Sequence, residues 1–536
     1  MRILLFLIVI AGLIGCSEDF LERTNPSTMS LDNFYETKSD FDMALAGVYN
    51  VLLRSDNYNM SFWEHFMISS DDAHPGDDAE FGSLYGNDID NFTVRPDNII
   101  PLNIFSSNYI GIARANTVIS RIKDVDLEKS YKDMVIAECS FLRALYYFNL
   151  VRTFGDVPLI TREVNDPELV NVPRTDKLKI YTELIVPDLK DAASLLPETR
   201  DNTTHGRATS GAAKALLVKV YLTLAQYDAS YFTLAKTLAE EIITSGVYEL
   251  EPDFADIFKR ENEFGKESIF EINHKSGQDF YYFEGFGQGN HQPKRIGVGS
   301  FYNLAFSPRF KGPSKAGDSL GAFSFSGWGF AVPTTESDPR SEILSVPEGT
   351  GIVEQYQDGD MRKDVSILSY YDAAEELNIP VDHSISPYNI KKYDDWEESV
   401  NGEADDNFML LRLADVYLMY AEADNEVNNG PTDKAYEYIN IVRRRAFGYP
   451  LNQPSPVDLS GLSYDEFLKA VYLERRLELA FEGHRWFDLA RRPEMAIETM
   501  KKQGKTAINK DKLILPIPQY VIDESDGLIT QNEGYN

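Results

Sequence analysis

The sequence predicts a mainly α-helical scaffold of paired helices, with a loop-rich, irregular middle region and a few short strands. Three observations support this fold class. Apolar residues recur at steps of three and four positions near both ends of the chain, which is the pattern of amphipathic helices. Short turns join many of these segments, as in tetratricopeptide-like helical-repeat arrays. Between residues 262 and 408 this periodicity gives way to Gly, Pro, Ser and Asp, which favour loops.

Residues 1–15 form a predicted lipoprotein signal peptide. One cation, Arg2, precedes an apolar run that ends in Leu13-Ile14-Gly15-Cys16. A charged start followed by a short apolar run is typical of a secretory signal, and the run is shorter than the roughly 20 residues that span a bilayer. The last four residues match the lipobox of bacterial lipoproteins. We therefore expect cleavage before Cys16, lipidation of that cysteine and attachment to a membrane by acyl chains.

Helices are predicted throughout the N-terminal part. In 132–153, for example, Phe141, Leu145 and Phe148 fall on one face. Small residues such as Ala212 and Ala213 would let neighbouring helices approach closely, although no strict repeat period is present. The predicted helices of this part are 39–54, 107–123, 132–153, 175–196, 210–227 and 230–245.

The C-terminal part continues the helical pattern. We expect helices at 410–427, 432–447 and 464–482. Ser463 and Glu466 have the spacing of a capping box at the start of the last of these. Gly483 stands just past its expected final turn, where glycine commonly ends a helix.

Two loop-rich stretches, 56–106 and 262–408, interrupt the helices, and short strands are predicted at Ser268–Ile272 and Asn389–Lys392. Long irregular segments on a regular scaffold often carry function. We therefore expect three parts after the signal peptide, packed as one globular body. These are an N-terminal helical region (16–261), a ligand-facing insert (262–408) and a C-terminal helical region (409–536), and the last two form one C-terminal region, 262–536.

Composition narrows the class of ligand. The 536 residues include 52 Lys and Arg against 85 Asp and Glu, a formal net charge of −33. Such a charge disfavours nucleic acids and polybasic membrane binding. Aromatic residues make up 12% of the chain, more than an average core requires. Aromatic faces stack on the apolar faces of sugar rings, so the composition favours a carbohydrate as the ligand.

No strong catalytic motif is present. Gly317–Gly321 fits the Gly-x-Ser-x-Gly pattern, but no apolar strand precedes it, as a nucleophile elbow requires. The seven histidines lack the spacing of a helical metal pair. Cys139 lies in a helical run and is expected to be a buried apolar residue rather than a nucleophile. Acidic residues are abundant, but nothing selects the carboxylate pair of a glycosidase, so an enzyme of that kind stays an alternative.

One cluster of acidic residues could bind calcium, because its carboxylate oxygens are of the kind that calcium prefers. The spacing of an EF-hand loop is absent, so a solvated acidic loop is the favoured interpretation and structural calcium the alternative. No other cofactor is predicted. The cluster consists of Asp71, Asp72, Asp77, Asp78 and Glu80.

Candidate ligand-binding residues are aromatic side chains expected in loops, because such side chains are free to meet a ligand. Polar neighbours would supply hydrogen bonds. For Trp328, between two glycines, plugging the core is an equal alternative. The aromatic candidates are Trp63, Tyr85, Tyr281, Tyr282, Phe286 and Trp328. The polar candidates are Asp72, Asn290, His291 and Gln292.

Several segments between Cys16 and Tyr535 form recognisable blocks. The N-terminal blocks are Phe141–Phe148 followed by Phe154-Gly155-Asp156-Val157-Pro158-Leu159, Pro173–Pro197, and Gly206–Leu217. The C-terminal blocks are Leu411–Glu422, Glu474–Leu489, Leu515–Pro518 and Gln531–Tyr535. In this order, the blocks resemble the SusD/RagB family of outer-membrane nutrient-binding lipoproteins. In Glu474–Leu489 charges of both signs alternate at helical spacing, which predicts ion pairs that join this helix to its neighbours. Trp486 in the same block is expected to pack in the core.

The resemblance implies a function. Family members bind glycans or other nutrients at the surface of the outer membrane and catalyse nothing. They deliver oligosaccharides to a TonB-dependent β-barrel transporter of the SusC type. The alternatives are a binder of peptides or another nutrient on the same scaffold, a lid whose partner does the recognition, and a glycoside hydrolase.

Overall fold

The fold is known from a computed structural model that describes most of the chain. It describes residues 34–76, 83–164, 172–282, 294–298, 300, 331–336, 345–369, 388–393 and 404–535. The predicted signal peptide, Cys16 and the Gly317–Gly321 motif lie outside the described residues.

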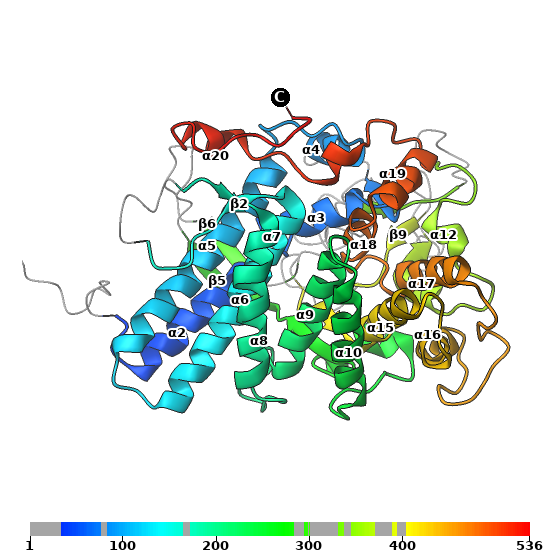
Figure 1. The fold of residues 1–536 in the computed structure, drawn as a ribbon, viewed down its shortest axis with the longest axis horizontal. Helices are drawn as coiled ribbons and strands as arrows, with labels where there is room; N and C mark the ends of the chain where they lie inside the picture. Colours follow the sequence, from blue (N-terminus) through cyan, green and yellow to red (C-terminus); the bar gives the residue numbers. More distant parts are fainter. Residues whose placement is uncertain are drawn as a thin grey trace, which may run out of the picture.

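The molecule is mainly helical, as predicted, and successive long helices pack against one another (Figure 1). α5 packs on α6, α6 on α8, α8 on α9 and α9 on α10, and α10 then packs on α15, which contacts α16 and α17. The long helices are α2 (Lys38–Tyr49), α5 (Ile99–Arg121), α6 (Lys129–Phe154), α8 (Val186–Leu195), α9 (Ser210–Leu224), α10 (Ser230–Thr244), α15 (Leu413–Asn428), α16 (Asp433–Ala446) and α17 (Tyr464–Glu478). The shorter ones are α3 (Ser61–Ile68), α4 (Ser83–Asp90), α7 (Lys177–Ile180), α12 (Ile352–Gln355), α13 (Arg362–Ser366), α18 (Arg485–Ala490), α19 (Pro493–Lys502) and α20 (Gln519–Asp523).

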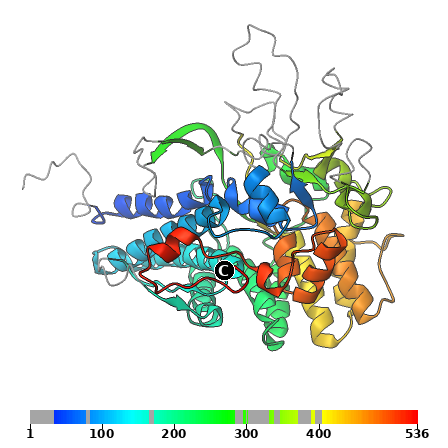
Figure 2. The same ribbon diagram turned by 90° about the horizontal axis from the view of Figure 1, so that it is seen from above.

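The described strands form five two-stranded antiparallel sheets. Figure 2 shows the β5–β6 hairpin (green) standing out on the side of the molecule where α2 (dark blue) lies. The pairs are β1 (Ala73–Pro75) with β7 (Ala331–Pro333), β2 (Val157–Pro158) with β3 (Arg174–Thr175), β4 (Ser268–Ile272) with β10 (Phe408–Arg412), β5 (Lys275–Tyr282) with β6 (Lys294–Val298), and β8 (Ile367–Ser369) with β9 (Tyr388–Ile390).

One main core joins the two ends of the chain, since its buried residues run from Phe41 to Tyr535. α6 is the only described helix that is long and apolar enough to cross a membrane, but 89% of its apolar window is buried inside the protein. It is therefore a core helix. Cys139 lies on it and is fully buried, as predicted.

Most of the predicted helices are present, but three predictions need correction. The stretch 56–106 is not mainly loop, because α3, α4 and the first turns of α5 lie within it. The helix expected from residue 410 begins at Leu413, since the preceding residues pair with β4 as strand β10.

The helix expected to run from 464 to 482 ends at Glu478. Its capping box is formed as predicted, with the Ser463 side chain accepting from the Glu466 N–H. Phe481 and Gly483 have φ values of 63° and 76°, in the left-handed region that a helix cannot contain. The Lys392 ammonium donates to the carbonyl of Ala480 at 2.9 Å, which satisfies a backbone group that the broken helix leaves free.

A cluster of buried charges lies behind this break, and we call it the central ion cluster. Its members come from both the middle and the C-terminal parts of the chain. Arg362, Arg412 and Arg445 in it are each 0% exposed, so their carboxylate partners are needed to offset the cost of desolvation. The cluster comprises Arg362, Lys392, Arg412, Arg443 and Arg445 with Glu267, Asp360, Glu474, Glu478 and Glu482.

Ion pairs also extend from α17 and α18 to other elements. The Arg475 guanidinium pairs with Asp415 of α15 at 2.8 Å, and that of Arg485 pairs with Asp71 at 2.7 Å. These contacts confirm the prediction that the charged block from 474 to 489 is joined to its neighbours by ion pairs. Trp486 is 1% exposed in a small second core, also as predicted.

A glycine sets the close approach of α5 and α6, and it gives a first testable prediction. A Cβ atom on Gly111 would lie 2.4 Å from the Tyr146 ring. That ring is held in place because the Tyr146 hydroxyl donates to the Val48 carbonyl at 2.7 Å. We expect Gly111→Ala to lower the free energy of unfolding by about 1–3 kcal/mol through overpacking, measured by urea denaturation.

Gly47 on α2 is the matched control. Nothing lies within 4 Å of a Cβ placed there, so Gly47→Ala should be neutral or stabilising by up to about 1 kcal/mol. Equal effects of the two substitutions would contradict the close helix crossing at Gly111.

A buried histidine gives a pH prediction. His65 on α3 is 2% exposed, and burial, followed by the nearby Arg152, lowers the pKa of His65 to about 3. Because the unfolded chain takes up this proton near pH 6.5 and the folded chain does not, the histidine costs stability as the pH falls from about 6.5 to about 3. We expect the stability advantage of the wild type over His65→Gln to shrink by about 1.4 kcal/mol per pH unit in this window.

Denaturation of both proteins at several pH values measures this difference. His205→Gln serves as a control, because His205 lies on the surface of a cavity rather than in the core. A constant difference between the wild type and His65→Gln from pH 7 to pH 4 would contradict a buried, neutral His65.

Candidate functional site

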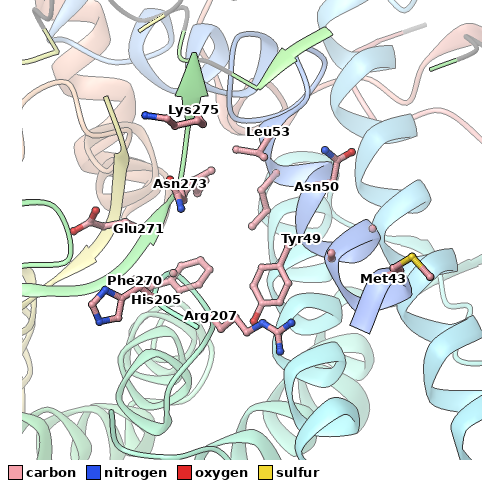
Figure 3. A pocket seen from close by; sticks show the side chains of 15 residues that line it. Met43, Tyr49, Asn50, Leu53, His205, Arg207, Phe270, Glu271, Asn273 and Lys275 are labelled. Atoms are coloured by element: carbon pink, nitrogen blue, oxygen red, sulfur yellow. The ribbon is translucent and has the colours of Figure 1, made fainter. Parts of the chain in front are cut away.

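A cavity of about 630 Å³ lies between the C-terminal end of α2 and strands β4 and β5. Figure 3 shows Tyr49, Asn50 and Leu53 on one side of it, facing Phe270, Asn273 and Lys275 across the opening. We call it the α2–β4 cavity. Its volume falls within the range of small-ligand sites. The lining residues are Met43, Ala46, Gly47, Tyr49, Asn50, Leu52, Leu53, His205, Gly206, Arg207, Phe270, Glu271, Ile272, Asn273 and Lys275.

The walls of this cavity are mainly apolar and are fixed by contacts behind them. The Tyr49 hydroxyl donates to Oε2 of Glu138 at 2.7 Å and accepts from the Ala208 N–H at 2.9 Å. Burial, and then Glu138, raise the pKa of Tyr49 well above its usual value, so the phenol stays neutral. Phe270 packs edge-on against Phe141 with ring centroids 5.1 Å apart. The aromatic walls are therefore preorganised.

Polar groups surround these walls. Asn273 is exposed, and the ammonium of Lys275 pairs with Asp405. Both oxygens of Glu271 are occupied, one by the Phe264 N–H and the other by the Asn407 amide, each at 2.9 Å. Burial raises the pKa of Glu271. An apolar surface with amide and cationic groups at its edge suits a ligand with an apolar face and hydroxyl groups.

The structure places three of the predicted ligand residues around β1, away from the lining of this cavity. Asp72 precedes β1, Trp63 lies on α3 and Tyr85 lies on α4. The two aromatic residues were expected in loops, so their assignment to helices is a correction. Tyr85 is 43% exposed and therefore accessible to a ligand.

Asp72 is 2% exposed, and its Oδ1 accepts from Nε of Arg476 at 2.8 Å. The neighbouring Asp71 binds Arg485 with both oxygens. Burial acts against ionisation, but Arg476 and Arg485 hold the pKa of Asp71 below its usual range. These two acids are thus committed to internal ion pairs, whereas Asp77, Asp78 and Glu80 lie outside the described residues. Within the described part of the chain, no group of three acidic, histidine or cysteine side chains could hold a metal ion.

Two further candidates lie on the β5–β6 hairpin. In the backbone register of the hairpin, Tyr281 lies opposite Arg295 and Tyr282 lies opposite Lys294. Both tyrosines therefore belong to a strand, which corrects the prediction that they lie in a loop. The strand begins at Lys275 in the wall of the α2–β4 cavity, which connects these tyrosines to the cavity through one element. Phe286, Asn290, His291, Gln292 and Trp328 lie outside the described residues.

The comparison with known families decides the identity of the fold. A model described as the SusD family matches residues 262–535, about half of the chain. The chain belongs to the SusD family. A second model, described as starch-binding associating with outer membrane, matches residues 19–222.

Individual relatives of this SusD-family protein cover nearly its whole length. SusD-like protein P25 of Formosa agariphila is 28% identical over 91% of this chain and 89% of its own. A solved structure described as a laminarin-binding SusD-like protein is 29% identical, with a TM-score of 0.73 over 94% of this chain and all of its own. A SusD homologue from Bacteroides thetaiotaomicron is 26% identical, with a TM-score of 0.74 over 95% and 99% of the two chains.

The SusD family is a non-catalytic family of glycan-binding, outer-membrane-associated proteins. Family membership therefore confirms the prediction that this SusD-family protein is not an enzyme. The resemblance found in the sequence is confirmed as well.

The residues of the α2–β4 cavity were not predicted from the sequence. Tyr49 lies within the predicted helix 39–54, and the apolar face of α2 is mostly core, with Phe41, Leu45 and Val48 buried. Phe270 was placed on a short strand without a role. Tyr49 and Phe270 line one cavity because β4 lies opposite α2 in the fold. No local sequence pattern links residues more than 200 positions apart.

Proposed function

We propose that this protein captures oligosaccharides at the cell surface and delivers them to a TonB-dependent β-barrel transporter of the SusC type. Membership of the SusD family is the observation that carries this proposal. The acidic, aromatic-rich composition adds support, because neutral sugars incur no electrostatic penalty at a surface with a net charge of −33.

We further propose that the glycan lies along the α2–β4 cavity and the adjoining β5–β6 hairpin. The cavity offers the apolar surface of Met43 and Leu53 beside the polar groups of Asn273 and Lys275. Of the predicted residues, Tyr281 and Tyr282 lie on the hairpin of this site, and we expect one of them to contact the glycan. Trp63, Asp72 and Tyr85 stay predictions for a separate contact around β1, where Tyr85 is exposed and Asp72 is held by Arg476. Phe286, Asn290 and Trp328 stay predictions outside the described residues.

A glucan of the laminarin type is the first ligand to test, because a relative of 29% identity and nearly full coverage is described as laminarin-binding. Calorimetry should compare laminarin oligosaccharides with other neutral glycans and with short peptides. We expect saturable binding of a glycan and none of peptides. Asn273→Ala should weaken binding, whereas Asn452→Ala, on an exposed loop far along the chain, should not.

Binding of peptides but of no glycan would overturn this function in favour of another nutrient. Equal glycan affinity of the wild type and Asn273→Ala would show that the glycan binds elsewhere than in the α2–β4 cavity.

The lipid anchor at Cys16 and the transporter partnership also belong to this proposal. We expect wild-type protein to sediment with outer membranes and Cys16→Ser to be released, because stable attachment requires acyl chains. Affinity purification of the membrane-bound protein should recover a large β-barrel transporter. Membrane retention of Cys16→Ser would contradict anchoring through that residue.

A further inference from the structure

A second cavity, of about 310 Å³, lies where α6, α7, α9 and α18 converge, and we call it the α6–α18 cleft. Figure 1 shows α7 and α18 on either side of α9 in this region. Its lining shares no residue with the α2–β4 cavity. The lining residues are Val151, Arg152, Lys177, Tyr181, Thr223, Gln226, Tyr227, Phe487, Ala490, Arg491, Pro493, Lys510, Leu513 and Ile514.

The charge of this cleft is opposite to that of the molecule. The chain carries a formal net charge of −33, yet the described residues that line the cleft include four cations and no acidic side chain. Arg491 is offset by Glu422 and Asp488 behind it. Lys510 forms an exposed pair with Glu494 at 3.1 Å.

The other two cations, Arg152 and Lys177, have no carboxylate partner among the described residues. The Arg152 guanidinium donates to Oδ1 of Asn149 at 2.7 Å, but its buried Nε atom has no acceptor. The Cζ atom of Arg152 lies 3.7 Å from the ring centroid of Phe487 and 4.7 Å from that of Phe148. Burial lowers the pKa of Arg152 to about 10, so the side chain remains charged at neutral pH. Arg152 is only partly exposed, and a cation withdrawn from water without a counter-ion among the described residues is costly, since such groups are usually paired in proteins.

Lys177 is the second cation without a carboxylate partner among the described residues. Its ammonium lies 5.4 Å from the ring centroid of Tyr227, and that tyrosine is 46% exposed. Tyr181 and Phe487 add aromatic surface to the same cleft. The cleft therefore combines two positive charges that lack a counter-ion with aromatic faces suited to the apolar face of a ring.

We propose that the α6–α18 cleft binds a small acidic sugar, that is, a sugar ring bearing a carboxylate or a sulfate group. The negative group would supply the missing counter-ion of Arg152 and Lys177, and the ring would lie against Tyr227. The volume is at the lower end of the range for small-ligand pockets, which fits one or two sugar units rather than a long chain. This site is separate from the proposed site for neutral glycans and does not depend on it.

Calorimetry with the purified chain tests this proposal, using glucuronic acid, glucose 6-sulfate, glucose, inorganic sulfate and a short glutamate peptide as probes. We expect at least one acidic sugar to bind ten times more tightly than glucose, with an affinity that falls as salt is added. The carboxylate and sulfate probes distinguish the two acidic groups. Neutral-glycan binding, measured in parallel, reports on the other site.

Variants locate the binding. Lys177→Gln and Tyr227→Ala should each weaken binding of the acidic sugar about fivefold or more. Lys179→Gln is the matched control, because Lys179 is exposed, pairs with Glu183 and lines no described cavity. Arg152→Lys keeps the charge but loses the planar group and should also weaken binding, with thermal melting used to confirm that the variant is folded.

Three results would overturn the proposal. They are equal affinity for glucose and for both acidic sugars, equal effects of Lys177→Gln and Lys179→Gln, and binding of the glutamate peptide or of inorganic sulfate with no binding of either acidic sugar. If the wild-type chain binds an acidic sugar but no neutral glycan, this result contradicts only the proposed capture of neutral glycans and not the acidic-sugar site.

Discussion

Replacement of Glu478 by glutamine should lower the free energy of unfolding by about 3–5 kcal/mol. Oε1 of Glu478 accepts from Arg412 and from Arg445, each at 2.5 Å, and Oε2 accepts from Arg362 at 3.1 Å. All four side chains are 0% exposed. The substitution removes one buried negative charge while three buried guanidinium groups stay in place, so the remaining carboxylates of the cluster offset their desolvation only in part.

The pKa of Glu478 points the same way. Burial opposes ionisation, but Arg445, Arg412 and Arg362 hold the pKa of Glu478 well below its usual value. The ion pairs of Glu478 therefore stabilise the fold fully above the pKa that Glu478 has in the unfolded chain, near 4.5. This stabilisation is lost progressively as the pH falls from there toward the lower pKa of the folded chain.

Urea denaturation at pH 7 measures this effect, and Glu437→Gln is its control. Glu437 also pairs with an arginine, Arg444, but its side chain is 47% exposed, so its loss should cost less than about 1 kcal/mol. A loss for Glu478→Gln as small as that for Glu437→Gln would show that the central ion cluster does not stabilise the fold.

The second large effect is expected in ligand binding, at Tyr281 and Tyr282. Successive residues of a strand present opposite faces, so we expect only one of these two neighbours on β5 to contact the glycan. Alanine at that position should weaken binding by about 2 kcal/mol, the size of an interface hot spot, which is roughly 30-fold in Kd. Alanine at the other should change Kd less than about threefold.

Calorimetry on the two single variants and on the double variant measures this difference. Tyr449→Ala is the control, because Tyr449 is 39% exposed and belongs to the connection between α16 and α17. Equal and small effects at all three positions would exclude the β5–β6 hairpin from the glycan site.

Local sequence patterns predicted the helices well because packing repeats every turn and capping residues are local. The capping box at Ser463 is an example, since its two partners are three residues apart. The apolar pattern did not predict where the same helix ends. There, Lys392 donates a hydrogen bond to the carbonyl of Ala480, and Arg412 donates one to that of Glu478. Those partners are more than 60 residues away, so no local pattern reveals them.

The candidate site was harder to predict for the same reason. Aromatic residues were selected on the assumption that they lie in loops, but Trp63, Tyr85, Tyr281 and Tyr282 lie on helices and a strand. The walls of the α2–β4 cavity resemble core residues in sequence. The ion pairs of Glu474–Leu489 were predictable in kind because charge alternates there at helical spacing. Their partners, such as Asp71 and Asp415, were not.

We expect this SusD-family protein to bind a neutral glycan without altering it. Titration of the purified chain with laminarin oligosaccharides, followed by calorimetry and by an assay of reducing ends on the same samples, tests this function directly. Saturable binding and no new reducing ends after prolonged incubation are the expected results. Release of reducing ends, or absence of binding to laminarin and to every other neutral glycan tried, would contradict the proposed function.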